Sequence, residues 1–390
     1  MKNKLLKIQS VTFHKPFCIK TAPSCDTFLT LTVLALALYG TMMVFSAGYA
    51  YAYARYDDGF YFIKRQIIWL ILGLIAMYFA SHVKPGFYKG ITPIIYISTL
   101  VLLLLVLVIG MVGNGAKRWI SIGPLTIQPS EIAKVAIILI LAKYFSDYSD
   151  LALEKKDRKI ILTYGTLFPI LLMLIPVRLV MLQKHLSCII ILGTLGLLII
   201  VGAGVNLRYI AMCCVGGAGG VSALALLTDY TKERITVWQN PEAYKLTGGW
   251  QTLQGLMAIG SGGLFGVGYG NSVMKHCYVS EPANDMIFTI LCEELGLVGA
   301  VFALILFALI VYRGYFIAVR AADVFSRLTA FGISTKMAIQ TLLNVAVVTN
   351  TIPNTGISLP FFSYGGSSLI MIFVEMGILL SISRFSRITK

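Results

Sequence analysis

Charged residues are scarce in this chain of 390 residues, since Asp, Glu, Lys and Arg together make up only 13% of it. Globular domains typically contain about 25%, so the chain lacks the polar surface that a protein surrounded by water needs. Apolar residues make up 57%, and the mean hydropathy is +0.82. The composition excludes an ordinary water-soluble domain and indicates a protein that crosses a membrane several times.

Sequence patterns for metal, redox and nucleotide sites are also missing. The seven cysteines form no CxxC pair and show no other metal-ligand spacing. The glycine-rich stretch 260–275 matches neither GxGxxG nor GxxxxGK, and no strand is expected before it. We therefore expect no nucleotide or redox cofactor, and we expect this stretch to be a mobile, closely packed outer loop.

Acidic residues are few relative to basic ones, 17 against 32, and the formal net charge is +15. The cations flank apolar runs instead of forming one basic surface. We therefore expect them to contact anionic lipid headgroups and expect no binding of nucleic acid.

Apolar runs near the length of about 20 residues that crosses a bilayer as a helix recur along the whole chain. They predict an all-α polytopic membrane protein with roughly ten transmembrane helices and a large extracellular loop, 229–283, between helices 7 and 8. The expected spans are 28–46, 64–81, 91–112, 129–146, 160–178, 187–205, 208–228, 284–312, 326–350 and 362–383.

Lysine and arginine cluster on alternate sides of these spans. They lie before the first span, after the fourth, after the eighth and at the end of the chain, which the positive-inside rule assigns to the cytoplasm. We therefore expect a basic cytoplasmic segment 1–27, a single transmembrane domain 28–383 and a cytoplasmic tail 384–390, with both termini inside.

Four carboxylates gather in SEPANDMIFTILCEELG, residues 280–296. Pro282 favours a helix start, which would place Asp285 in the first turns of the eighth span, at the outer boundary. A helix N-terminus favours the carboxylate while partial burial raises its proton affinity, so Asp285 could serve as a base. An acid that merely begins a helix would show the same pattern.

The remaining acids of this stretch lie deeper. Glu293 and Glu294 would lie about 12–14 Å further along the same helix, where ionised side chains usually face the bundle interior or a wet cavity. Their angular offsets from Asp285, about 80° and 180°, allow at most one of them to share its face.

Two further groups of charged residues precede and enter the fourth span. Glu131 and Lys134, in QPSEIAK, have the i, i+3 spacing of an ion pair, which could hold the bundle together or face a substrate. Lys117 and Arg118 adjoin Trp119, and this cluster could anchor the chain at the membrane interface or hold a phosphate-bearing lipid. In LPFFSYGGSSL, 359–369, paired small residues favour close helix packing but could also line a substrate site.

Long motifs in a fixed order identify a family. AKRWISIGPLTIQPSEIAK, DYTKERI, WQTLQGLMAIGSGGLFGVGYGNSVMK, DMIF, EELG and NTGISLPFFSYGGSSL resemble the FtsW/RodA/SpoVE family of shape, elongation, division and sporulation proteins, essentially end to end. Segments such as NDMIF and SAGYAYAYARY resemble the division branch, FtsW, most, while an elongation or sporulation role stays open. The family resemblance implies a peptidoglycan glycosyltransferase that polymerises undecaprenyl-pyrophosphate-linked lipid II at the outer face of the bacterial cytoplasmic membrane.

The resemblance also implies roles for residues and partners. Asp285 would deprotonate the sugar 4-hydroxyl of one lipid II, which attacks the anomeric carbon of the growing chain as undecaprenyl pyrophosphate departs. Similar enzymes use a divalent cation, Mg²⁺ or Mn²⁺, whose ligands this sequence does not identify. They pair with a class B penicillin-binding transpeptidase and with other division or elongation complex proteins. The candidate substrate-binding residues are Lys117, Arg118, Glu131, Lys134, Lys275, Glu281 and Glu294.

Two departures from the family pattern and two other functions stay open. Ala283-Asn284 replaces the frequent His-Thr before the aspartate, and Gln183-Lys184-His185 replaces Gln-Pro-Asp before the sixth span. A lipid II flippase is suggested by the acidic and basic groups inside the spans. A non-enzymatic scaffold of the division complex would use the apolar eighth and ninth spans to dock a partner helix.

Overall fold

The computed structural model describes residues 25–113, 116–122, 125–148, 161–183, 185–205 and 229–385, with the single residues 208 and 211. Most of the expected segment 1–27, almost all of the expected span 208–228 and the last residues of the expected tail 384–390 lie outside the described residues.

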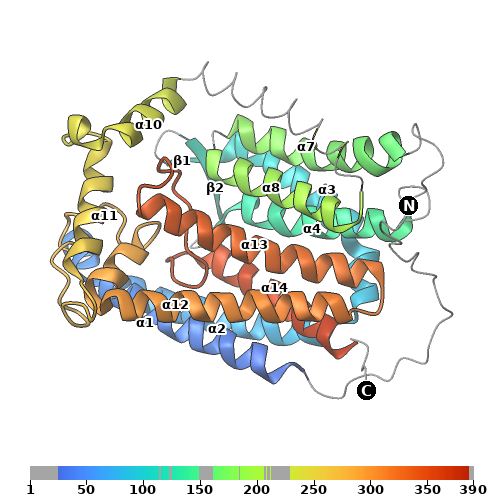
Figure 1. The fold of residues 1–390 in the computed structure, drawn as a ribbon, viewed down its shortest axis with the longest axis horizontal. Coiled ribbons are helices and arrows are strands. Elements are labelled where there is room, and N and C mark those ends of the chain that lie inside the picture. Colours follow the sequence, from blue (N-terminus) through green and yellow to red (C-terminus); the bar gives the residue numbers. More distant parts are fainter. Residues whose placement is uncertain are drawn as a thin grey trace, which may run out of the picture.

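Long helices form one bundle in which they run roughly parallel or antiparallel (Figure 1). Nine of the ten expected spans coincide with helices in the described part of the chain. These are α1 (Thr27–Tyr56), α2 (Tyr61–His82), α3 (Pro85–Ile109), α4 (Pro129–Asp147), α7 (Phe168–Leu182) after the π-helical η1 (Ile161–Leu167), α8 (Leu186–Gly202), α12 (Ile287–Arg320), α13 (Val324–Val348) and α14 (Gly366–Arg384).

Seven helical stretches among the described residues are long and apolar enough to cross a membrane: α1, α2, α3, Leu162–Leu182, α12, α13 and α14. α8 has only 17 residues, and α4 carries four charged side chains, Glu131, Lys134, Lys143 and Asp147. The multi-pass helical architecture is thus confirmed, while length and composition assign seven spans where the sequence predicted roughly ten.

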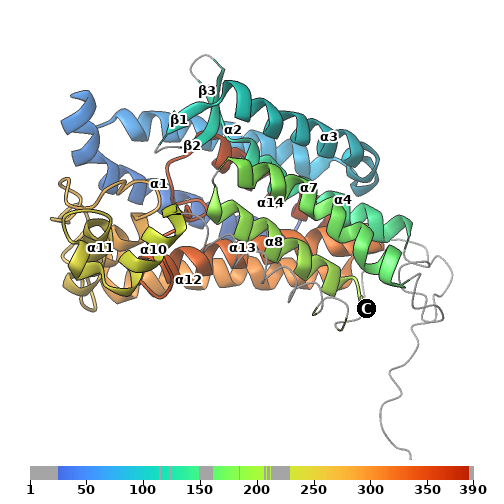
Figure 2. The same ribbon diagram turned by 90° about the horizontal axis from the view of Figure 1, so that it is seen from above.

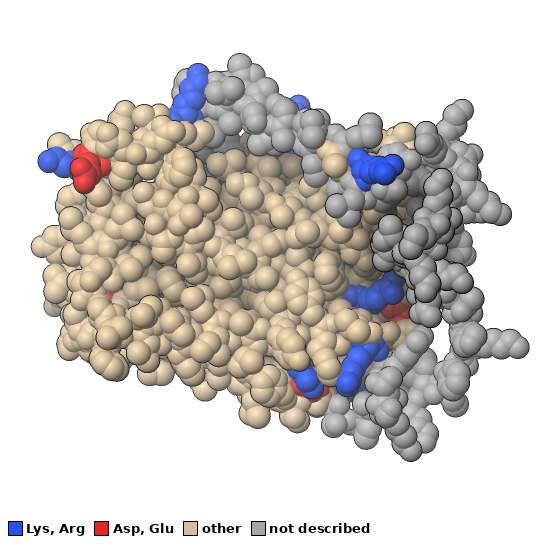
Figure 3. Space-filling view, viewed as in Figure 1, with Lys and Arg blue, Asp and Glu red and all other residues tan. Residues whose placement is uncertain are grey.

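An apolar belt surrounds the bundle. On the face drawn in Figure 3, charged side chains lie near the ends of the molecule and the broad middle is uncharged. Side chains on the outside of α3 show the same pattern, since Ile94 is 69% and Val108 is 75% exposed. A continuous apolar surface of this size is unfavourable in water, so lipid tails are its natural surroundings.

The centre of the bundle contains α4, α13 and α14. In α13 and in α14, 61% of the most apolar 18-residue stretch is buried inside the protein, whereas in α2 only 22% of it is buried. A fully buried ion pair joins α13 to α14, with Lys336 Nζ 2.8 Å from Glu375 Oε2. Charges at this depth are tolerated because they are paired.

A small antiparallel sheet was missed by the all-α prediction. It has the order β1 (Met111–Gly113), β2 (Ala116–Ile122) and β3 (Leu125–Ile127), with Ile120 opposite Ile127. The strands are short and lie between two long apolar runs, so they gave little signal of their own. The sheet presents the cationic pair Lys117 and Arg118 on one strand.

The start of α1 and the end of α14 lie at the same end of the bundle, because Arg384 Nε contacts Cys25 Sγ at 2.7 Å. The expected large outer loop lies at the opposite end, where α10 (Asp229–Gln239), η2 (Pro241–Tyr244) and α11 (Gly249–Ser261) cap the helices (Figures 1 and 2). Two opposite polar ends therefore flank the apolar belt.

α12 is interrupted at Gly296, whose φ of 64° is not helical. The glycine-rich loop fills this break: the amides of Val267 and Gly268 donate to the carbonyls of Glu293 and Glu294 at 2.9 and 3.0 Å. On the far side of the break, the amides of residues 297 and 298 donate to loop carbonyls at 2.9 and 3.1 Å. Backbone groups left unpaired by the break thus find partners, as a membrane environment requires.

Candidate active site

A cavity of about 1020 Å³ lies among the central helices and the loops at one end of the bundle. Its walls come from α2, β2, β3, α4, α8, α10, α11, α13, the start of α14 and the loops at 280–285 and 354–365. The ionisable side chains on these walls are Arg65, Arg118, Glu131, Lys134, His185, Cys188, Arg234, Glu281, Asp285 and Tyr364. Chain segments far apart in the sequence therefore meet at one polar site within an apolar bundle.

Asp285 lies on this wall, but its backbone differs from the prediction. α12 begins at Ile287 and not at Pro282, so Asp285 lies in a turn just before the N-cap residue Met286. Glu281 precedes Pro282 and has a φ of +55°, outside the extended region that residues before proline generally adopt. The sequence pattern could not reveal that tertiary hydrogen bonds favour a turn over a helical start here.

Those hydrogen bonds come from the other wall of the cavity. Asn344 Nδ2 of α13 donates to the Asp285 carbonyl at 2.9 Å, and Ser363 Oγ donates to the Asn284 carbonyl at 2.8 Å. The amide of Tyr364 donates to the Ala283 carbonyl at 2.8 Å. The turn is therefore held by α13 and by the loop that leads into α14.

The Asp285 carboxylate is chemically available. The residue is half-buried, and its Oδ1 has no hydrogen-bond partner among the described residues. Burial, followed by the negative charge of Glu281, raises the pKa of Asp285 from 3.8 to about 7. Loss of hydration favours the neutral acid, and a nearby like charge acts in the same direction. A carboxyl group with this pKa can both accept and release a proton near neutral pH.

Glu131 and Lys134 form the ion pair that their spacing predicted, with Lys134 Nζ 2.8 Å from Glu131 Oε1. Lys134 also donates to Gln340 Oε1 of α13 at 3.2 Å. Both side chains line the cavity and are almost fully buried. The pair thus holds α4 and α13 together and lines the cavity, while a role in facing a substrate stays a prediction.

The neighbouring cations of β2 separate. Arg118 lines the cavity, whereas Lys117 donates to the carbonyls of Leu107 and Val108 at 3.3 and 3.4 Å, at the end of α3. Of the candidate cations near the outer boundary, Arg118 reaches the site, and Lys117 stabilises the C-terminus of a helix instead.

Two further candidates lie apart from the cavity. Lys275 and Glu294 pair with each other at 2.9 Å, and neither lines the site. Glu281 does line it and accepts a hydrogen bond from Asn284 Nδ2 at 2.6 Å. The structure therefore brings together Arg118, Glu131, Lys134, Glu281 and Asp285 but not Lys117, Lys275 or Glu294.

Sequence reasoning missed two arginines. Arg65 of α2 and Arg234 of α10 line the cavity, and Arg234 donates to the Asn354 carbonyl. Arg234 lies in the DYTKERI motif, which indicated the family but predicted no residue of the site. Arg65 follows Lys64 at the start of a span, where basic residues usually only mark the membrane boundary.

The glycine and serine residues before α14 serve two purposes. A side chain at Gly366 would overlap the indole of Trp69, so helix α14 can approach α2 only because this residue is glycine. Gly366 also lines the cavity, together with Gly365 and Ser368. The close-packing prediction is confirmed, and the same segment forms part of the site wall.

No group of three His, Cys, Asp or Glu side chains able to hold a metal ion occurs in the described part of the chain. Mg²⁺ needs only one or two carboxylates when phosphate oxygens complete its coordination. Glu281, on the cavity wall, is one carboxylate that could hold such an ion beside a phosphate-bearing ligand.

Fold and site together define a class of protein, a multi-pass helical membrane protein with a polar cavity in which an available carboxylate lies among arginine and lysine side chains. The chain belongs to the FtsW/RodA/SpoVE family, described as cell cycle proteins, and the family model matches residues 26–388.

Similar proteins and structures agree with this membership. The stage V sporulation protein E of Bacillus subtilis is 39% identical over 371 residues, covering 94% of this chain and 99% of that protein. The probable peptidoglycan glycosyltransferase FtsW of Geobacter metallireducens is 36% identical over 368 residues, covering 94% and 96%.

Two solved structures share the fold. A chain from a peptidoglycan synthase complex that coordinates polymerization and crosslinking superposes with a TM-score of 0.76 at 27% identity, covering 93% of this chain and 98% of that one. The rod shape determining protein RodA of Thermus thermophilus gives 0.68 at 28% identity, covering 93% and 97%.

Proposed function

We propose that this chain is a peptidoglycan glycosyltransferase that polymerises lipid II into glycan strands at the outer face of the bacterial cytoplasmic membrane. The observation that carries the proposal is Asp285, a half-buried carboxylate with an unpartnered oxygen on the wall of a cationic cavity. Relatives named peptidoglycan glycosyltransferase support it.

Asp285 is the proposed general base. It removes the proton from the 4-hydroxyl of the acceptor sugar, whose oxygen forms the new bond to the anomeric carbon of the donor chain. The bond from that carbon to the undecaprenyl diphosphate breaks, and the electron pair leaves with the diphosphate. A positioned base accelerates such a step by about 10²–10⁴-fold.

Cations on the cavity wall stabilise the departing diphosphate. Arg65, Arg118, Lys134 and Arg234 all line the cavity, and Arg side chains bind phosphate oxygens through two parallel hydrogen bonds. Lys134 is paired with Glu131 on the same wall. Fixed charges aimed at developing negative charge act strongly in a site shielded from water.

A divalent cation, Mg²⁺ or Mn²⁺, remains part of the proposal. Glu281 would hold it together with the diphosphate oxygens of the substrate, and the ion would supply charge neutralisation for the leaving group.

The pH dependence of polymerisation tests the base. Because the pKa of Asp285 is raised to about 7, the active carboxylate form is lost as the pH falls through that value. We expect kcat/KM, which reports the pKa of the free enzyme, to drop about tenfold for each pH unit below about 6. A polymerisation rate that does not change between about pH 5 and about pH 8 would contradict Asp285 as the base.

Neighbouring cations of β2 provide a matched test of the diphosphate site. We expect Arg118→Gln to lower kcat/KM for lipid II by about 10²-fold, the effect of removing one charged donor from a leaving-group site. Lys117→Gln should change it less than about twofold, since Lys117 lies outside the cavity. Equal effects of the two substitutions would place the diphosphate elsewhere.

Orientation and partners follow from the same proposal. The start of α1 and the end of α14 lie at one end of the bundle, and we assign that end to the cytoplasm from the positive-inside rule. A class B penicillin-binding transpeptidase would dock on the apolar belt, as would other division or elongation complex proteins, and the likeness to a chain from a peptidoglycan synthase complex supports such assembly. Scaffolding then accompanies catalysis.

A lipid II flippase is less well supported. Of the four charged residues that suggested a transport path, Glu131 and Lys134 pair with each other on the cavity wall. Glu293 and Glu294 bind the glycine-rich loop and do not line the cavity. A measurement of lipid II transfer between vesicle leaflets, with Asp285→Asn as active as the wild type, would favour the flippase.

A further inference from the structure

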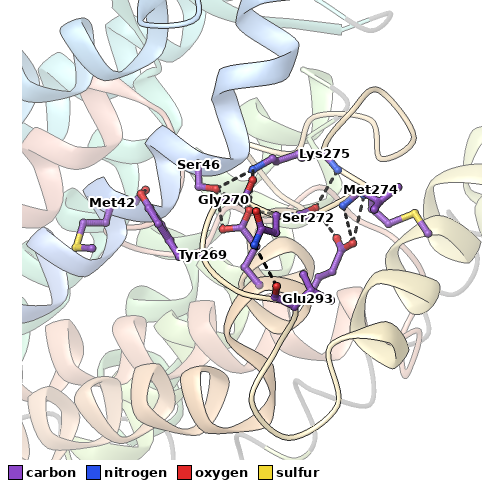
Figure 4. A network of polar contacts seen from close by, with 12 residues as sticks. Met42, Ser46, Tyr269, Gly270, Ser272, Met274, Lys275 and Glu293 are labelled. Atoms are coloured by element: carbon purple, nitrogen blue, oxygen red, sulfur yellow. Dashed lines mark hydrogen bonds and ion pairs between the residues drawn. The ribbon is translucent and has the colours of Figure 1, made fainter.

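Lys275 and Glu294 form a buried ion pair that the proposed chemistry does not use. Lys275 Nζ lies 2.9 Å from Glu294 Oε1, and the two side chains are 5% and 0% exposed. Lys275 Nζ also donates to Ser46 Oγ of α1 at 3.1 Å and to the Gly270 carbonyl at 2.6 Å (Figure 4). Since neither charge lines the cavity, the pair needs an explanation other than substrate contact.

Asp285 lies near the middle of the chain segment whose ends this ion pair joins. Lys275 precedes it by ten residues and Glu294 follows it by nine. Residues 276–286 form turns without regular helix, and α12 begins only at Ile287. Joining the two ends closes a loop and removes conformational freedom from the residues between them.

Glu293 holds the same loop from the adjacent position. Its Oε2 accepts a hydrogen bond from Ser272 Oγ at 2.5 Å, and its Oε1 accepts from the amides of Val273 and Met274 at 2.9 and 3.4 Å (Figure 4). Residues 287–294, which carry both carboxylates, are buried throughout. The loop is therefore fastened to the helical segment that immediately follows Asp285.

A second set of contacts fastens this assembly to α1. Ser46 Oγ lies 2.6 and 2.7 Å from the two carboxylate oxygens of Glu294, and Tyr269 Oη donates to the Met42 carbonyl at 2.8 Å. Helix α1 packs against both α2 and α12, and α2 contributes cavity residues. The ion pair thus connects the segment that carries Asp285 to the frame that carries the cationic wall.

We propose that the Lys275–Glu294 pair is a positioning device that fixes the Asp285 carboxylate relative to the cationic wall of the cavity. The inference rests on the proposed function, because it acts through Asp285. Lys275 and Glu294 touch no substrate and exert their effect by holding both ends of the segment that carries the base.

The test is steady-state polymerisation of lipid II by the full chain in complex with a transpeptidase-inactive partner. We expect Lys275→Met to lower kcat at least about tenfold, because a displacement of about 1 Å in a catalytic group can reduce the rate about 100-fold. KM should change less than about twofold, because the cavity residues are intact. Lys275→Arg keeps the charge and should recover most of the lost kcat.

Matched controls separate this inference from the proposed function. Lys64→Met breaks an exposed pair with Asp58 and should leave kcat unchanged, and Asp285→Asn is measured in the same assay. If Asp285→Asn is inactive while Lys275→Met keeps the wild-type kcat, the positioning inference is overturned and the proposed function stands. If Asp285→Asn polymerises normally, the proposed base is wrong.

Two other outcomes are also decisive. A Lys275→Met protein with raised KM and unchanged kcat would mean that Lys275 contacts substrate, which overturns the inference. If Lys275→Met does not fold, Glu294→Gln decides instead, because it removes the charge while keeping the shape of the side chain. A wild-type kcat in Glu294→Gln would then overturn the inference, and a lowered kcat at constant KM would support it.

Discussion

Asp285→Asn is expected to abolish glycan polymerisation, lowering the rate by about 10²–10⁴-fold, the range that a positioned general base contributes. The amide keeps the size of the side chain but has no proton affinity near neutral pH. The measurement is polymerisation of purified lipid II by this chain in complex with a transpeptidase-inactive partner, followed by the length distribution of the glycan strands.

The matched control for this substitution is Asp58→Asn, because Asp58 pairs with Lys64 on the exposed surface outside the cavity. It should polymerise at the wild-type rate. Equal amounts of polymer from Asp285→Asn and wild type would move the base to another residue. Absence of polymer from both, with a correctly assembled partner, would make leaflet transfer of lipid II the next measurement.

Lys336→Met is expected to give the largest loss of stability, about 3–5 kcal/mol of unfolding free energy. It leaves Glu375 in the centre of the bundle, 0% exposed, without the ammonium group that lies 2.8 Å from its Oε2. An isolated buried carboxylate is strongly unfavourable. Unfolding of the detergent-solubilised protein, followed by heat or by titration with a denaturing detergent, measures the difference.

Comparing the double substitution Lys336→Met with Glu375→Leu to the single substitution shows how much of the lost stability comes from leaving Glu375 unpaired. Removing both charges should recover most of the stability, because a buried ion pair often contributes little beyond what apolar packing provides. Lys64→Met, which breaks an exposed pair, should change the free energy of unfolding by less than about 1 kcal/mol. A single Lys336→Met protein as stable as the wild type would show that Glu375 has another partner or is neutral.

Local sequence spacing predicted some of the site correctly. Glu131 and Lys134 are three residues apart on one helix, so helical geometry alone brings them together, and their ion pair is present. The start of α12 was less predictable, since Pro282 favours a helix but tertiary hydrogen bonds from Asn344 and Ser363 hold a turn. Local preference was outweighed by contacts with distant residues.

Separation along the chain explains what the sequence could not show. Lys117 and Arg118 are adjacent and chemically alike, yet one contacts the end of α3 and the other lines the cavity. Arg65 and Arg234 are 169 residues apart, the difference between their sequence numbers, and line the same cavity. The pattern of residues within one helix or strand does not show which residues of distant segments lie close together.

The sequence by itself determined the solvent and the multi-pass helical class of fold, because composition and the length of apolar runs can be read without knowing which distant residues meet. The family resemblance of its motifs is what singled out Asp285 as the proposed base. Only the tertiary structure decided which cations surround Asp285, that Lys275 and Glu294 pair away from the cavity, and that α12 breaks at Gly296 around a glycine-rich loop. Those features arise from backbone and side-chain groups that must find partners across the bundle, where no water replaces them.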